Sequence, residues 1–194
     1  IDGEPSRFAV IDVGTNSVKF HIGERDRDEP WRTVVDRAEM TRLGEGLEQH
    51  NVIGDAALER TTAAIAGMVD EAKRREVLAI AAVGTAGLRI ASNRDAVLAS
   101  IEARTGLRIE VISGDEEGRL AYVAATSGLG LSAGSLVVFD TGGGTTDVAL
   151  VRQGGIEGTR MFALGGRAFT KSLADRLDLP FQRAETVKVD FARG

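Results

Sequence analysis

The residues best suited to chemistry lie in one short stretch, LVVFDTGGGTTDVALV, at residues 136–151. Two apolar runs typical of β-strands are joined there by three successive glycines and two threonines. Because glycine has no Cβ, successive backbone amides can point into one concavity and approach an anion closely. The stretch therefore predicts a hairpin whose turn binds phosphate. The predicted contacts are Gly142, Gly143, Gly144, Thr145 and Thr146.

Two acids flank this turn, since Asp140 ends the first apolar run and Asp147 begins the second. Carboxylate oxygens are ligands for hard divalent cations such as Mg²⁺, and they can also orient an attacking water. The alternative is a plain glycine-rich hairpin in which Asp147 is only a turn acid. We favour the metal site, because acids, glycines and hydroxyls occur together at this spacing.

The same pattern occurs near the start of the chain, in VIDVGTNSVKF at residues 10–20, with Asp12 in the place of Asp140. The two acids are 128 residues apart, which is too far for a solenoid repeat but suits two related domains that each carry a phosphate loop. We expect the site in the cleft between them, with Asp12 among the metal ligands. The phosphate contacts expected in this hairpin are Gly14, Thr15, Asn16 and Ser17.

The intervening segments predict a mixed sheet covered by helices. Residues 8–40 predict a three-strand antiparallel meander, and a helix is expected to begin at Asp55. The apolar run at 77–83 is typical of a strand buried on both faces. A helix near 94–104 and a strand at 107–112 complete an α/β unit.

A second meander, ending near Leu164, repeats this order, and helices follow it, but the half that completes the first unit is absent from the second. We therefore predict a first domain at 1–127, a hinge at 128–134 and the first part of a second domain at 135–194. The helix at the end of the first domain is expected to begin at Ser113, with an acidic first turn that complements its dipole.

Composition restricts the class of protein. The 194 residues are 43% hydrophobic, with a net charge of −5 and a pI near 5.2. This balance argues against a nucleic-acid partner or an anionic membrane surface. The sequence has no cysteine and two histidines, which excludes disulfides and thiol catalysis and leaves His-rich zinc sites poorly supported. It shows no membrane span and no signal peptide, so we expect a cytoplasmic protein.

Between residues 8 and 128 the chain resembles the Ppx/GppA family of exopolyphosphatases and guanosine pentaphosphate phosphohydrolases. The resemblance rests on IDVGTNSVKF, TRLGEGL, AVGTAGLR and IEVISGDEEGRLAY, in that order. The family belongs to the superfamily of acetate kinase, sugar kinases, heat-shock proteins and actin. The resemblance implies duplicated actin-like (ribonuclease H-like) domains, and a Mg²⁺-dependent hydrolase acting on polyphosphate or guanosine pentaphosphate (pppGpp).

The resemblance also implies roles for two residues outside the hairpins. Arg89 in GTAGLR would clamp a phosphate, as a guanidinium can with two parallel hydrogen bonds; the alternative is a surface arginine near a helix start. Glu117 in SGDEEGRL would be the general base that accepts a proton from water. The chain departs from the family where Asp147 and Gly118 replace the usual Glu and Ala.

The C-terminal third also resembles actin-like ATPases of the FtsA and heat-shock type, through GGGTTDVALV, LGGRAFTKSLADRLDLP and AETVK. That resemblance implies that Glu185 and Lys188 contact the ribose or adenine of ATP, the alternative being an ordinary i, i+3 ion pair. Two further functions thus stay open: an ATP-binding actin-like protein that uses closure for assembly or partner binding, and an inactive fragment. The sequence does not choose between polyphosphate and pppGpp or between a monomer and a homodimer.

Overall fold

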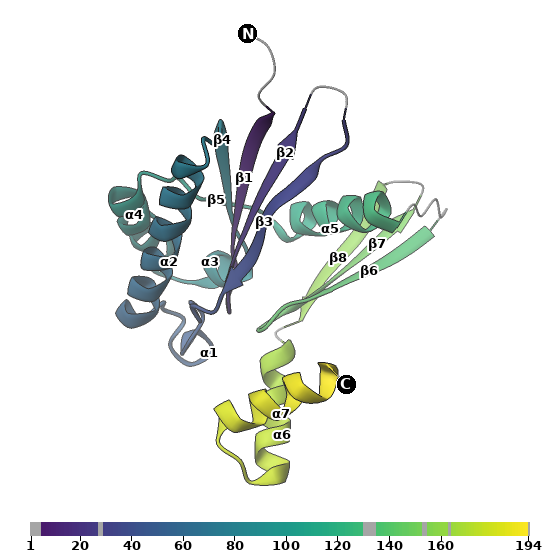
Figure 1. Ribbon diagram of the computed structural model, residues 1–194. Coiled ribbons are helices and arrows are strands. Elements are labelled where there is room, and N and C mark those ends of the chain that lie inside the picture. Colours follow the sequence, from purple (N-terminus) through teal and green to yellow (C-terminus); the bar gives the residue numbers. More distant parts are fainter. Residues whose placement is uncertain (1–4, 27–28, 130–134, 153–154, 163, 194) are drawn as a thin grey trace. The chain divides into compact units, whose positions relative to one another are not determined.

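The computed structural model describes residues 5–26, 29–129, 135–152, 155–162 and 164–193 (Figure 1). Its contacts divide the chain into two compact units, Ile1–Ser113 and Gly114–Gly194. By these contacts the helix that follows Ser113 belongs with the second unit, whereas the sequence-based division assigns most of it to the first domain. Most of the predicted hinge, 128–134, lies outside the described residues, and the domain limits stay a prediction.

The first unit is built on a five-stranded mixed sheet of order β3-β2-β1-β4-β5. β1, β2 and β3 form the predicted antiparallel meander, and β4 and β5 continue the sheet in parallel with β1. The strands are β1 (Ser6–Val13), β2 (Val18–Arg25), β3 (Arg32–Glu39), β4 (Ala79–Gly84) and β5 (Glu110–Val111).

Two long helices of this unit lie on one side of the sheet, where α2 packs on β1 and β2 and α4 packs on α2 (Figure 1). Both were predicted from the sequence, α2 from its apolar periodicity. The short α1 and α3 were not, because four or five residues are too few to show a helical period. The helices are α1 (Leu47–His50), α2 (Asp55–Arg74), α3 (Ala86–Ile90) and α4 (Arg94–Thr105).

Burial alternates along the strands, because successive side chains point to opposite faces of a sheet. In β1, Ile11 and Val13 are buried in the core while Val10 is 44% exposed. In β4, Ala79 and Ala81 are exposed although the run is wholly apolar. The prediction that this strand is buried on both faces is therefore wrong, because the helices that pack on the sheet cover one face.

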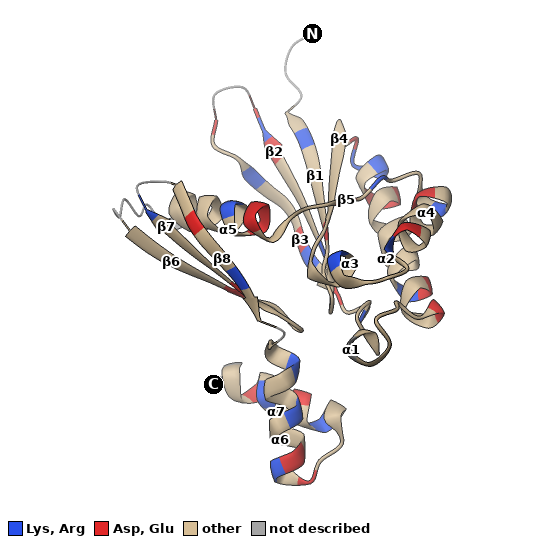
Figure 2. Ribbon diagram, turned by 180° about the vertical axis from the view of Figure 1, so that it is seen from behind, with Lys and Arg blue, Asp and Glu red and all other residues tan. Residues whose placement is uncertain are grey.

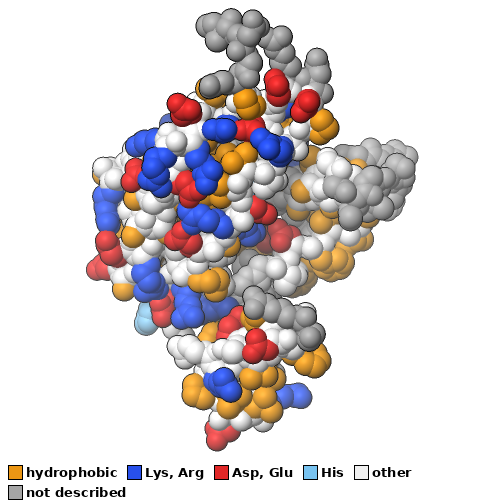
Figure 3. All heavy atoms as spheres, viewed as in Figure 1, with side chains coloured by type: hydrophobic (Ala, Val, Ile, Leu, Met, Phe, Trp, Pro, Cys, Tyr) orange, Lys and Arg blue, Asp and Glu red, His pale blue; other side chains and the backbone are white. Residues whose placement is uncertain are grey.

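The second unit holds a three-stranded antiparallel sheet of order β6-β7-β8, and one helix, α5, packs on all three strands. Two further helices, α6 and α7, pack on each other and expose apolar side chains (Figure 3). The elements are α5 (Gly114–Leu129), β6 (Ser135–Thr141), β7 (Thr146–Arg152), β8 (Gly155–Phe162), α6 (Gly166–Leu177) and α7 (Phe181–Arg193).

The two meanders share their register, which confirms the internal repeat. Asp12 pairs with Lys19 across the first hairpin, and Asp140 pairs with Asp147 across the second, at positions shifted by the same 128 residues. The pairing with the third strand is irregular at Ile22/Gly23 and at Leu150/Val151, again 128 residues apart. The α/β fold with a repeated meander is thus as predicted.

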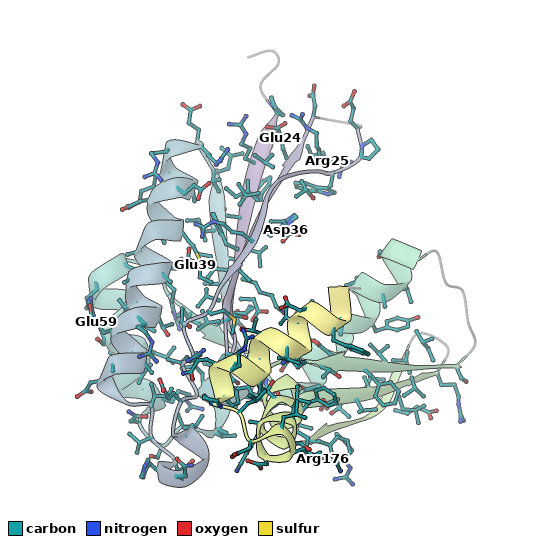
Figure 4. All side chains as sticks on the ribbon, turned by 60° about the horizontal axis from the view of Figure 1, so that its bottom comes forward. Glu24, Arg25, Asp36, Glu39, Glu59 and Arg176 are labelled. Carbon is teal, nitrogen blue, oxygen red and sulfur yellow. The ribbon has the colours of Figure 1, made fainter. Side chains whose placement is uncertain are left out.

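One charge cluster joins the three strands of the first meander. Glu24 of β2 is only 4% exposed and accepts hydrogen bonds from Arg7 Nε at 2.6 Å and from Arg32 (Figure 4 labels Glu24). Both hydrogen bonds lower the pKa of Glu24 below the ordinary 4.5 of a glutamate, and the bond from Arg32 has the larger effect.

We predict that Glu24→Gln destabilises the protein at neutral pH. A carboxyl whose pKa is lowered in the folded state adds stability above its unfolded pKa and loses it as the pH falls through the folded value. The difference from wild type should therefore be largest at about pH 7 and shrink from about pH 5 downward. Urea unfolding at several pH values measures it, with Glu102→Gln on the exposed side of α4 as control. A difference independent of pH would contradict the assignment.

Candidate functional site

The predicted base and two of the three predicted metal ligands, Asp140 and Asp147, line one pocket of the second unit, whereas Asp12 belongs to the first unit. Gly114, Glu117, Gly118 and Ala121 recur at i, i+3, i+4 and i+7, which places them on one face of α5. Opposite this face, all three strands contribute side chains. The strand residues of this open pocket are Val138, Asp140, Asp147, Val148, Ala149 and Thr159.

A glycine lets α5 approach the sheet. A Cβ on Gly118 would lie 3.1 Å from the Ala149 Cβ and 3.1 Å from the Thr159 Cγ2, tighter than ordinary van der Waals contact. The Thr159 hydroxyl also donates a hydrogen bond to the Asp115 carboxylate, which holds the start of α5 against β8. The neighbouring acid, Glu116, instead pairs with Arg119 through two hydrogen bonds. Glu117 is therefore the acid of this turn that lines the pocket.

Asp140 and Asp147 lie directly opposite each other on β6 and β7. Like charges at such a position repel and destabilise the pair, unless a cation lies between them. The matching pair of the first unit is attractive, because Lys19 Nζ lies 3.4 Å from Asp12 Oδ2. The oxygen-rich second pair fits Mg²⁺, although the described residues contain no cluster of three or more potential protein ligands.

The second loop, residues 142–145, is shaped by the backbone that follows β8. Gly142 N donates to Thr145 O at 2.8 Å, and the carbonyls of Gly142 and Gly143 accept from Gly166 N at 2.9 Å and Arg167 N at 2.8 Å. In a trans peptide the N–H points opposite to the preceding carbonyl, and the described chain has no cis bond. The amides that follow these two carbonyls therefore point away from α6, as an anion-binding nest requires.

The first loop, residues 14–17, is held in a similar way, but its accepting carbonyls lie one position later than those of the second loop. Gly14 N donates to Ser17 O at 3.0 Å. The carbonyls of Thr15 and Asn16 accept from Gly44 N and Arg42 N, both at 2.8 Å, so the next two amides point away from that segment. Gly44 and Gly165, which follow the third strand of each meander, lie against the two loops. They could have indicated these contacts from the sequence, but the sequence analysis assigned them no role in the site.

Two other predicted phosphate contacts, Thr146 and Arg89, donate hydrogen bonds to backbone carbonyls of the protein. The Thr146 hydroxyl donates to Leu164 O at 2.7 Å, which occupies its single proton. Arg89 Nη1 donates to Ile112 O at 3.1 Å. Gly87, near the start of α3, lies against Thr15, where its Cβ would be 3.2 Å from the hydroxyl oxygen. The first loop and the helix of Arg89 are therefore neighbours in the first unit.

Glu185 and Lys188 form the i, i+3 ion pair that the sequence analysis gave as an alternative, with Lys188 Nζ 2.8 Å from Glu185 Oε2. Their side chains are 31% and 22% exposed, so the pair is partly buried. A nucleoside contact stays a prediction.

Comparisons with known proteins identify the family of this chain. A model of the Ppx/GppA phosphatase family matches residues 7–186. A guanosine-5'-triphosphate,3'-diphosphate pyrophosphatase of Vibrio vulnificus is 34% identical over 151 residues, which are 76% of this chain and 29% of the relative. Exopolyphosphatase 1 of Mycobacterium leprae is 27% identical over 143 residues, 74% of this chain and 42% of the relative.

A solved structure gives the same result. The Ppx/GppA family member of Aquifex aeolicus superposes with a TM-score of 0.72 at 26% identity, covering 89% of this chain and 54% of that one. The fold is therefore of the actin-like α/β class. The chain belongs to the Ppx/GppA phosphatase family, and it spans roughly a third to just over half the length of these relatives.

No helix in the described part of the chain is both long enough and apolar enough to cross a membrane. The surface of the first unit carries acidic and basic side chains intermixed on α2 and the adjacent strands (Figures 2 and 3).

We predict that Gly165→Ala distorts the second loop. An added Cβ would lie 2.6 Å from Gly142 O and 2.8 Å from two further backbone carbons of the loop, so backbone must shift. We expect a loss of about 1–3 kcal/mol in unfolding free energy, measured by urea denaturation. Gly158→Ala, where a Cβ meets nothing within 4 Å, is the control. Equal stability of the two variants would refute the close contact.

We predict that Mg²⁺ stabilises the wild type through the acid pair. In EDTA, Asp140→Asn should unfold at the same or a higher temperature than wild type, because it removes a repulsion worth about 0.2–1 kcal/mol. Added Mg²⁺ should raise the melting temperature of the wild type and not of the variant.

Asp12→Asn is the control for this experiment, since it breaks an attractive pair and should lower stability in either buffer. A Mg²⁺ response that survives Asp140→Asn and disappears in Asp12→Asn would place the cation at the first hairpin instead.

Proposed function

We propose that this chain forms the phosphate-binding and proton-accepting part of a phosphohydrolase that releases terminal phosphate from polyphosphate or pppGpp. The observation that carries the proposal is that Glu117 lines one pocket with Asp140 and Asp147. A second loop with outward amides connects the strands of those two acids. The two relatives support the proposal, because both are named as enzymes that act on phosphoanhydrides.

In the proposed reaction Glu117 accepts a proton from water as the water oxygen bonds to the terminal phosphorus. The anhydride P–O bond breaks in line, and the leaving oxygen takes the electron pair. The amides of Gly143 and Gly144 donate to the non-bridging oxygens, which carry the charge of the transition state. Asp140 and Asp147 would hold Mg²⁺, which offsets negative charge on the phosphates.

The first loop and Arg89 belong to the same proposal as further contacts to the phosphate chain. Amides and a guanidinium bind any phosphate oxygen without reading a base.

We predict that Glu117→Gln lowers the rate of phosphate release by about 10²–10⁴-fold, the usual contribution of a general base. Polyphosphate and pppGpp are assayed with Mg²⁺, and the affinity for polyphosphate is measured separately. The amide keeps the shape of the carboxylate but cannot accept the proton, so binding should change little.

The adjacent Glu116→Gln is the matched control, because Glu116 pairs with Arg119 and does not line the pocket. Its rate should stay near that of wild type. Retained turnover in Glu117→Gln, or an equal loss in Glu116→Gln, would remove Glu117 from the role of base. ATP is included as a third substrate, and a clear preference for ATP would favour the actin-like ATPase instead.

A further inference from the structure

Lys188 of α7 reaches the first turn of α6. Its Nζ lies 3.2 Å from Gly166 O, 2.8 Å from Thr170 Oγ1 and 2.8 Å from Glu185 Oε2. An ammonium has three protons to donate, and these three acceptors match them. Thr170 is fully buried, and its single hydroxyl proton can be donated either to Gly166 O, at 2.9 Å, or to Glu185.

The position of this ammonium is unusual for a helix start. A cation near the N-terminus of a helix opposes the helix dipole, so Lys188 needs a compensating charge there. Glu185 supplies it from one turn earlier in α7. Because the whole cluster is partly buried, its members are held by one another rather than by water.

The same turn of α6 holds the second loop. Gly166, whose carbonyl binds Lys188, donates its own N–H to Gly142 O at 2.9 Å, and Arg167 N donates to Gly143 O at 2.8 Å. Gly165 lies so close to the loop that it has no space for a Cβ. A displacement of this turn must therefore change the direction of the amides that follow Gly142 and Gly143.

We propose that Lys188 is a positioning residue, which fixes the second loop by clamping the first turn of α6 to α7. The chain of contacts runs from Glu185 through Lys188 and Gly166 to Gly142. With its three protons donated internally, Lys188 has none left for a ribose or an adenine. The effect on activity rests on the proposed function, whereas the effect on the loop does not.

Hydrogen exchange of individual amides tests the positioning role without any substrate. In Lys188→Met, which keeps an unbranched side chain but loses the charge, the amides of Gly142, Gly166 and Arg167 should exchange at least about tenfold faster. That change corresponds to the loss of one charge-assisted hydrogen bond. Lys188→Arg should restore part of the protection, because it keeps the charge.

Lys171→Met is the matched control, since Lys171 is an exposed lysine of the same α6. It should leave the exchange of these amides unchanged. Unchanged exchange in Lys188→Met, or equal acceleration in Lys171→Met, would overturn the proposal. So would a Lys188→Met variant that loses ATP binding while the three amides stay protected, because Lys188 would then be a nucleoside ligand.

Phosphate release provides the second measurement. Lys188→Met should raise the KM for polyphosphate and lower kcat together, since the loop contacts the phosphoryl group in both the ground and transition states. If the wild type releases no phosphate from polyphosphate or pppGpp, the proposed function fails while the exchange result still decides the positioning role. Normal kinetics with accelerated exchange would overturn the link between the loop and turnover.

Discussion

The loop carbonyls of both hairpins accept hydrogen bonds from the backbone that follows the third strand, and the site depends on this constraint. In the first unit the donors are Gly44 and Arg42, and in the second they are Gly166 and Arg167. Because a peptide is planar and trans, binding a carbonyl on one side turns the next amide to the other. Each loop is thereby oriented by a segment about 25 residues further along the chain, and not by its own sequence alone. This explains why glycines occur after the meander as well as within the turn.

The repeat preserves the strand register and changes the charge. At equivalent positions the first hairpin pairs Asp12 with Lys19, and the second pairs Asp140 with Asp147. In the first hairpin the lysine places a cation 3.4 Å from the carboxylate. In the second, two carboxylates occupy the same pair of positions, and like charges there repel. One strand register thus carries a different charge pattern in each unit.

Much of the fold was readable from sequence, because apolar periodicity and turn residues are local signals. The meanders, α2, α4 and the 128-residue repeat follow from spacing along the chain. The one-sided burial of β4 was not predictable in this way, since an apolar run looks the same whether a helix covers one face or two. The packing of α5 on the second sheet depends on Gly118, whose missing side chain shows its purpose only when Ala149 and Thr159 are in place.

For the candidate site, the sequence by itself determined which groups are present: the acids at 117, 140 and 147, the glycines of the loops, and the family to which they belong. Tertiary structure alone decided what those groups contact. It brought Glu117 into one pocket with two acids from other elements, directed the Thr146 hydroxyl to a backbone carbonyl, and joined Lys188 to the first turn of α6. The physical reason is that residue type fixes the chemistry a side chain can perform, whereas the partner that satisfies its hydrogen bonds and charge comes from distant segments brought close by folding.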